Sequence, residues 1–132
     1  MNIKLQQKAT LATQQNIDAL GNWIIISSYP MQKGCFAYDE KLINRRKELD
    51  LKTKDSCPVV IDLPNAKSSH VAFAAIEALI SSFDLLTLAR KLVAAHVAGN
   101  PTKLGLMISG FKDTDAERIA EALISAELSE TA

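Results

Sequence analysis

Three short apolar runs punctuate the chain, at residues 23–26, 57–63 and 103–109. Each is rich in aliphatic or aromatic residues, is short for a helix, and gives way to turn-forming residues, which is typical of buried strands. The run at 57–63 has a proline at its edge and three consecutive β-branched residues. We expect this strand at the centre of a sheet, covered by helices on both faces.

Between these runs, apolar residues recur at the spacing of an amphipathic helix. Thr114 and Glu117 stand at the spacing of a capping box, and Ser68 or Ser69 is placed to cap a helix that begins at His70. The expected helices lie at residues 3–20, 40–49, 70–83, 84–98 and from 114 to the end of the chain. Whether 71–97 is one bent helix or two stays open.

Alternation of strand and helix favours parallel pairing, because parallel neighbours need long crossovers that helices supply. We therefore expect an α/β fold with a small sheet of three to four strands and helices packed on it. An additional strand at 35–38 would form a hairpin and make the fold α+β. With 132 residues the chain has the size of one domain, and we expect a single domain over 1–132.

Net charge and hydropathy give no support to several classes of partner. Lys plus Arg and Asp plus Glu both number 15, so no net charge steers the chain toward nucleic acid or anionic lipid. The longest apolar stretch, 71–97, is interrupted by four charged residues, and we expect no membrane span. Residues 1–7 lack the pattern of a secretory signal, so we expect a cytoplasmic protein.

The residues that bind metals and cofactors are few and scattered. Cys35 and Cys57 lie 22 residues apart, which fits neither a redox pair nor a zinc knuckle, and we expect reduced thiols. His96 falls late in an apolar helix and is expected to be a packing residue. No phosphate-loop or dinucleotide-binding glycine pattern is present, so the sequence predicts no metal and no cofactor.

The leading candidate for a ligand site is the polar segment that follows the strand at 57–63. Ligands of open α/β sheets bind at the carboxyl ends of strands, where helix N-termini attract anions. The candidate residues are Asp62, Asn65, Lys67, Ser68, Ser69 and His70, joined by Lys112 after the strand at 103–109. The structural alternative is that these side chains only cap a helix and form turns.

Charge is distributed unevenly along the chain. Between residues 41 and 54 six bases face two acids, whereas the segment from Asp113 onward carries six acids and one base, Arg118. A solvated helix explains the basic segment, and weak nucleic-acid binding or contact with the acidic last helix are alternatives. The candidate interaction residues are Lys41, Arg45, Arg46 and Lys47.

One stretch resembles a known family. Residues 59–63, the serine pair and the alanine-rich segment after it resemble the strand, phosphorylatable serine and helix of anti-sigma-factor antagonist (STAS) domains. Where that family has an acidic residue before the serines and a glycine after them, this chain has Lys67 and His70. An extra helix at 84–98 also intervenes, so the resemblance transfers no function to Ser68 or Ser69.

Three functions are compatible with these patterns. The first is a non-enzymatic interaction or accessory protein that forms homo-oligomers or binds a protein partner, because apolar, alanine-rich helices at 71–97 carry more apolar surface than a small sheet covers. The second is a small-molecule or phosphate-binding domain, with or without catalysis, at the strand ends. The third is nucleic-acid binding through residues 41–54, for which the sequence offers least.

Overall fold

The computed structural model describes residues 4–7, 17–18, 20–28, 38–48, 58–77, 80–97 and 103–131. Its elements are, in chain order, β1 (Lys4–Gln7), β2 (Asn22–Ser28), α2 (Asp39–Glu48), β3 (Val59–Asp62), β4 (His70–Ile76), α3 (Ser82–Val97), β5 (Lys103–Ser109) and α4 (Asp113–Thr131).

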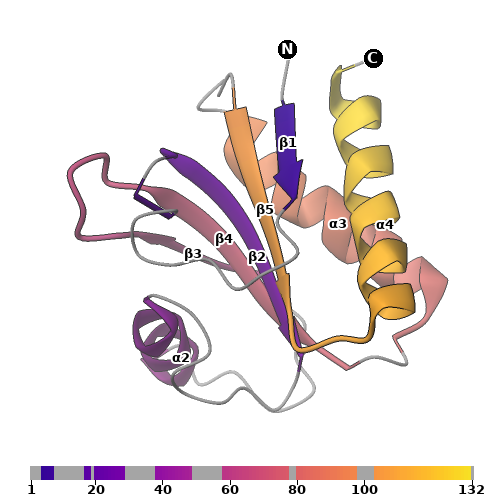
Figure 1. Cartoon of the computed structure of the whole chain (residues 1–132), viewed down its shortest axis with the longest axis horizontal. Coiled ribbons are helices and arrows are strands. Elements are labelled where there is room, and N and C mark those ends of the chain that lie inside the picture. Colours follow the sequence, from indigo (N-terminus) through magenta and orange to yellow (C-terminus); the bar gives the residue numbers. More distant parts are fainter. Residues whose placement is uncertain are drawn as a thin grey trace.

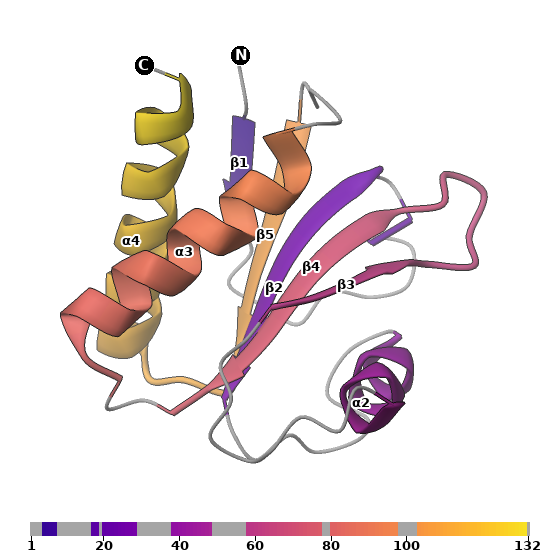
Figure 2. The same cartoon turned by 180° about the vertical axis from the view of Figure 1, so that it is seen from behind.

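The strands form one mixed sheet in the order β1-β5-β2-β4-β3. β2 runs parallel to both of its neighbours, β4 and β5, whereas β3 runs antiparallel to β4. Helices α3 and α4 lie on one face of this sheet and α2 lies on the other (Figures 1 and 2). The predicted class, a small sheet with helices packed on it, is confirmed, although the sheet has five strands instead of the expected three to four, and the antiparallel β3–β4 hairpin gives it the α+β form.

The central strand β2 is buried on both faces. Ile24 and Ile26 join the cluster under α3 and α4, while Trp23 and Ile25 join the cluster that includes Leu42 of α2. A strand covered on both sides has no polar face, which is why its sequence shows a continuous apolar run. The predicted strands at 23–26 and 103–109 are confirmed as β2 and β5.

Gly105 in β5 makes room for the indole of Trp23. A Cβ atom at Gly105 would lie 2.6 Å from Trp23 Cε3, which is far inside van der Waals contact. The indole Nε1 donates a hydrogen bond to the carbonyl of Ile17 at 2.9 Å. The glycine that weakens β5 as an isolated strand therefore allows the largest core side chain to lie against it.

The expected helix at 70–83 is wrong, because residues 70–76 form β4. Val71 to Ile76 are all buried, and β4 lies between β2 and β3 in the sheet. Ala72 and Ala74 of this strand lie in the core cluster under α3 and α4, whereas Ala75 lies in the cluster on the opposite face of the sheet. Residues 71–97 are thus a strand followed by one helix, α3, and the serine pair precedes a strand instead of the helix that the STAS resemblance implies.

Two further expectations about the sheet need correction. Residues 4–7 form β1, parallel to β5, so the expected helix over 3–20 does not extend through them. The strand predicted at 57–63 is confirmed over Val59–Asp62, but it lies at the edge of the sheet, with Val60 42% exposed, and not at its centre. The possible strand at 35–38 and both cysteines lie outside the described residues, apart from Tyr38, which is in a turn before α2.

The predicted helices at 40–49 and from 114 are confirmed as α2 and α4. None of the helices in the described ranges is long and apolar enough to cross a membrane.

Candidate functional site

The hairpin between β3 and β4 carries six of the seven predicted ligand-binding residues. The register aligns Asp62 with His70 and His70 with Asn22. The hairpin loop therefore lies at the end of the sheet where β2 and β4 begin. Lys112 follows the carboxyl end of β5. Because β5 is parallel to β2, it ends at the opposite end of the sheet from the hairpin loop. The strand ends therefore do not converge on one cleft, and Lys112 lies apart from the other six residues.

Asn65 and Ser69 are held in a polar network inside the hairpin. The Asn65 amide nitrogen donates to Asp18 Oδ1 at 2.8 Å and to Ser69 Oγ at 2.9 Å, and Asn65 Oδ1 accepts the Ser69 backbone N–H at 2.9 Å. Ser69 Oγ donates to the carbonyl of Leu20 at 2.7 Å, and this serine is completely buried. Both side chains are engaged within the protein, in agreement with the structural alternative for these two residues.

The same network reaches α2 through Tyr38. The Tyr38 hydroxyl donates to Asp18 Oδ1 at 2.7 Å, so one carboxylate oxygen receives donors from two segments that are distant in sequence. Tyr38 has a positive φ of 68°, a conformation that costs a tyrosine free energy and that its surroundings must hold. Sequence analysis missed Asp18 and Tyr38, since neither stands in a recognisable motif.

Lys67 and Ser68 are exposed at the turn of the hairpin. Ser68 adopts a positive φ of 46°, and its backbone N–H donates to the carbonyl of Asn65 at 3.0 Å. Ser68 thus serves the turn through its backbone, while its side chain stays accessible.

Asp62, His70 and His96 form a chain of contacts beside the hairpin. His70 Nδ1 lies 2.8 Å from Asp62 Oδ1, and the His70 ring meets the ring of His96 edge to face at 5.1 Å between centroids. His96 is 1% exposed and its Nε2 lies 2.8 Å from the carbonyl oxygen of Trp23. Its Nδ1 lies 3.2 Å from the side-chain oxygen Oδ1 of Asn22.

Burial determines the protonation of His96. The pKa of His96 is lowered from 6.5 to about 4, chiefly by desolvation of the buried ring; the hydrogen bond to Trp23 opposes this decrease and the nearby His70 adds to it. The neutral imidazole donates its Nε2–H to the Trp23 carbonyl. Across the described ranges no group of three His, Cys, Asp or Glu side chains is placed to hold a metal ion.

An Asp–His pair can act as a general base when a nucleophile lies within reach. The hydroxyl next to His70 in the chain, on Ser69, instead donates to a backbone carbonyl and is buried. The Asp62–His70 pair therefore does not activate this serine.

The basic interaction residues of α2 are unequally available. Lys41 and Lys47 are exposed and Arg45 is half-buried, but Arg46 is buried, with 7% of its surface exposed. α2 also lies across the sheet from the acidic α4 (Figures 1 and 2), so these two helices do not meet within one chain. Lys52 and Lys54 lie outside the described residues.

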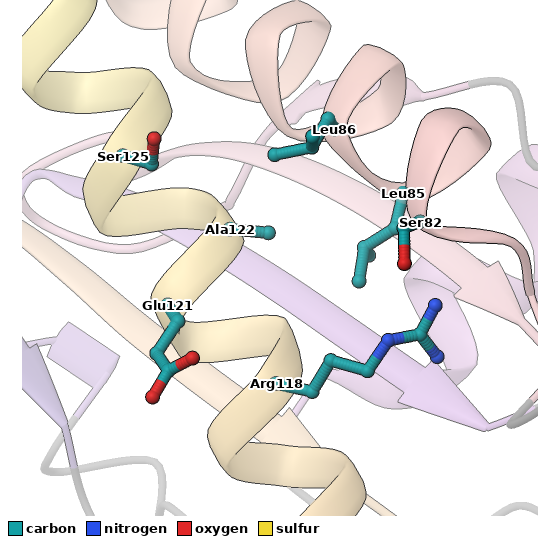
Figure 3. A pocket seen from close by; sticks show the side chains of 7 residues that line it. All are labelled: Ser82, Leu85, Leu86, Arg118, Glu121, Ala122 and Ser125. Carbon is teal, nitrogen blue, oxygen red and sulfur yellow. The ribbon is translucent and has the colours of Figure 1, made fainter.

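A groove of about 240 Å³ lies between α3 and α4, on the outer side of these helices (Figure 3). Its apolar lining is Leu85, Leu86 and Ala122, and its polar lining is Ser82, Arg118, Glu121 and Ser125. The Arg118 guanidinium reaches toward the beginning of α3 and donates from Nη2 to the carbonyl of Ile80. Excess apolar surface was expected over residues 71–97; in the structure the β4 part of this range is buried, and α3 carries the exposed Phe83 and Leu86.

Large apolar side chains remain exposed beside this groove. Phe83, in the first turn of α3, is 77% exposed, and Leu86 is 39% exposed. The segment Val71 to Ile76, in contrast, is buried in the core clusters on the two faces of the sheet and accounts for none of the exposed apolar surface. We call the outer surface of α3 and α4 around Phe83, Leu86, Arg118 and Glu121 the α3–α4 face.

No family model, curated protein or solved structure matches this chain.

Proposed function

We propose that the protein is a non-enzymatic accessory protein that associates with a second copy of itself through the α3–α4 face. The observation that carries the proposal is the exposure of Phe83 and Leu86 beside the apolar lining of the groove. Exposed apolar side chains clustered next to a groove are typical of protein interfaces, whereas single ones are ordinary on any surface.

The dimensions of the groove favour a macromolecular partner over a small ligand. Pockets that enclose small molecules usually measure roughly 300 to 1,000 Å³, and this groove measures about 240 Å³. Phe83, the most exposed of the large apolar residues, is not among the residues that line the groove, so a molecule confined there would not cover it. A protein surface laid across both helices covers both features.

The hairpin supports a ligand-binding function less well. Asn65 and Ser69, two of the side chains expected to bind a ligand, are occupied by hydrogen bonds within the protein. Lys112 lies beyond the opposite end of the strands, which leaves the exposed Lys67 and Ser68 at the turn and the hydrogen-bonded pair of Asp62 and His70 beside it.

Sedimentation velocity over a wide concentration range tests the proposal. We expect the wild-type protein to gain mass as its concentration rises, and the Leu86→Glu variant to have a dissociation constant at least about tenfold higher, because a charge replaces an apolar contact.

The matched control is Val60→Glu, which alters a residue of similar exposure, 42%, on β3 at the sheet edge. This variant should sediment like the wild-type protein, and circular dichroism should show that both variants are folded. A wild-type protein that stays monomeric at every concentration would overturn the proposal, and so would two variants with equal effects.

A further inference from the structure

We infer that the two copies meet about a two-fold axis perpendicular to α4, so that Arg118 of each copy pairs with Glu121 of the partner subunit. This inference rests on the proposed self-association and adds to it the geometry and the charge pairing of the interface.

The first step is the placement of the two charges. Arg118 and Glu121 are three residues apart on α4, about one helical turn, and both line the groove. Figure 3 shows the two side chains diverging, with Arg118 directed toward α3 and Glu121 directed away from it. Within the described part of the chain Glu121 has no ion-pair partner, and the hydrogen bond from Arg118 goes to a backbone carbonyl, Ile80.

The direction of a two-fold axis determines which charges of the two copies face each other. In a two-fold interface the same surface is used by both copies, so residue i meets j and j meets i. An axis that crosses α4 midway between Arg118 and Glu121 makes the two α4 helices antiparallel and sets each charge opposite its counterion. An axis parallel to α4 instead sets Arg118 against Arg118, and like charges across an interface are strongly unfavourable.

Apolar side chains lie next to the two charges. Leu86, which is 39% exposed, lines the groove together with the two charges, and Phe83, in the same part of α3, is 77% exposed, whereas Leu85 and Ala122 form the buried floor of the groove. Apolar side chains that exclude water around a polar contact strengthen it, because the contact then operates in a medium of lower dielectric constant. The apolar side chains provide the driving force for association, and the charges select its orientation.

A head-to-tail assembly is the competing arrangement. The acidic α4 of one copy would meet the basic residues of α2 on another, as the uneven charge of the sequence suggests. α2 and α4 lie on opposite faces of the sheet (Figures 1 and 2), so this contact would leave a free surface at each end and continue without closing. It would also leave Phe83 and Leu86 uncovered.

Complementary charge reversal tests the two-fold pairing. Arg118→Glu places two acids at this site and Glu121→Arg places two bases, so each variant alone sets like charges across the axis. We expect each to dimerise at least about tenfold more weakly than the wild-type protein. Mixed in equal amounts, the two variants should form a heterodimer, because every charge then faces its opposite, and native mass spectrometry distinguishes it from either homodimer.

The possible outcomes separate the inference from the proposed function. If the wild-type protein dimerises but the mixed variants stay monomeric, the two-fold pairing is wrong and self-association stands. If the wild-type protein is monomeric, the proposed function fails and the pairing with it. Mass that increases without limit supports the head-to-tail contact and overturns the pairing.

Arg118 also binds the Ile80 carbonyl, so Arg118→Glu can unfold the protein. In that event Glu121→Arg and Glu121→Gln are compared, since both leave Arg118 in place. The pairing requires a larger rise in the dissociation constant for arginine than for glutamine, and equal constants for the two variants and the wild-type protein would refute it.

Discussion

At the scale of single residues, His96 connects the end of α3 to the beginning of β2. The imidazole is buried, its Nε2 lies 2.8 Å from the Trp23 carbonyl oxygen, and its ring packs against His70. A buried neutral imidazole satisfies the Trp23 carbonyl, whereas a buried imidazolium must bear the cost of lost hydration. Proton binding to His96 is therefore linked to folding.

We expect the stability of the protein to fall as the pH is lowered from 6.5 to 4. The pKa of His96 is about 4 in the folded chain and 6.5 in its ordinary state, so the unfolded chain binds the proton more readily. The contribution of neutral His96 to the free energy of unfolding is complete above pH 6.5 and is lost as the pH falls toward 4. The loss amounts to about 3 kcal/mol. Urea unfolding at a series of pH values measures it.

The comparison with His96→Gln isolates this effect from the titration of carboxylates. Glutamine does not titrate, so the difference in unfolding free energy between wild type and variant should shrink as the pH falls. The groups that face His96 are His70 and, through it, Asp62. His70→Gln, as a control, should retain most of the wild-type pH dependence, and an identical pH dependence in His96→Gln and wild type would contradict this account.

At the scale of elements, the β3–β4 hairpin is attached to the rest of the molecule by side chains. Asn65 is the centre of this attachment, because it bridges Asp18 and Ser69 while Tyr38 holds the same carboxylate from the start of α2. Ser69 in turn donates to the Leu20 carbonyl. The side chains predicted to bind a ligand thus connect three separate segments of the chain.

We predict that Asn65→Ala destabilises the protein by about 2 kcal/mol, because it removes three hydrogen bonds and leaves partly buried groups without partners. Urea unfolding monitored by the fluorescence of the buried Trp23 measures the change. Ala66→Ser alters an exposed position of the same turn and should change stability by less than about 0.5 kcal/mol. Equal stabilities for the two variants would mean that the network is dispensable.

Strands and helices could be predicted from local sequence where the length of an apolar run and the turn residues that bound it indicated the same element as its apolar pattern. β2 and β5 were predictable because their apolar runs are short and bounded, and α2 and α4 because their apolar residues recur at helical spacing. β4 was not, because its alanine-rich sequence runs on toward α3 and a wholly buried strand has no alternation to identify it. The edge position of β3 depends on its antiparallel pairing with β4, which no local pattern records.

The same limit applied to the candidate site. Placing Asp62 to His70 together needed only their proximity in sequence, and the β3–β4 hairpin carries all six of these residues. Grouping Lys112 with them assumed that all strands are parallel, and the reversed direction of β3 separates them. Arg118 and Glu121 carried no sequence signal beyond ordinary charged helix positions, because their groove exists only once α3 and α4 pack side by side.

At the scale of the whole molecule, the sheet divides the surface into two unlike sides. One side carries α2 with its basic residues, and the other carries α3 and α4 with the exposed Phe83 and Leu86 (Figure 2). The two clusters of the core are correspondingly separate, one under each layer of helices. An interface on the α3–α4 side can therefore form without rearranging the α2 side or the hairpin.

Self-association through one face couples thermal stability to concentration. When only the folded chain dimerises, dimer formation draws the equilibrium away from the unfolded state, and the midpoint of unfolding rises with total protein. We expect a Tm that increases by a few degrees, on the order of 4 °C for each 1 kcal/mol of added stability in a domain of this size, between dilute and concentrated wild-type samples. In Leu86→Glu the Tm should rise less over the same concentration range, because the variant dimerises more weakly, while Val60→Glu should follow the wild-type protein. A wild-type Tm that does not change with concentration would show that no interface contributes to the stability of the fold. The exposed Phe83 and Leu86 would then not mark a surface for self-association.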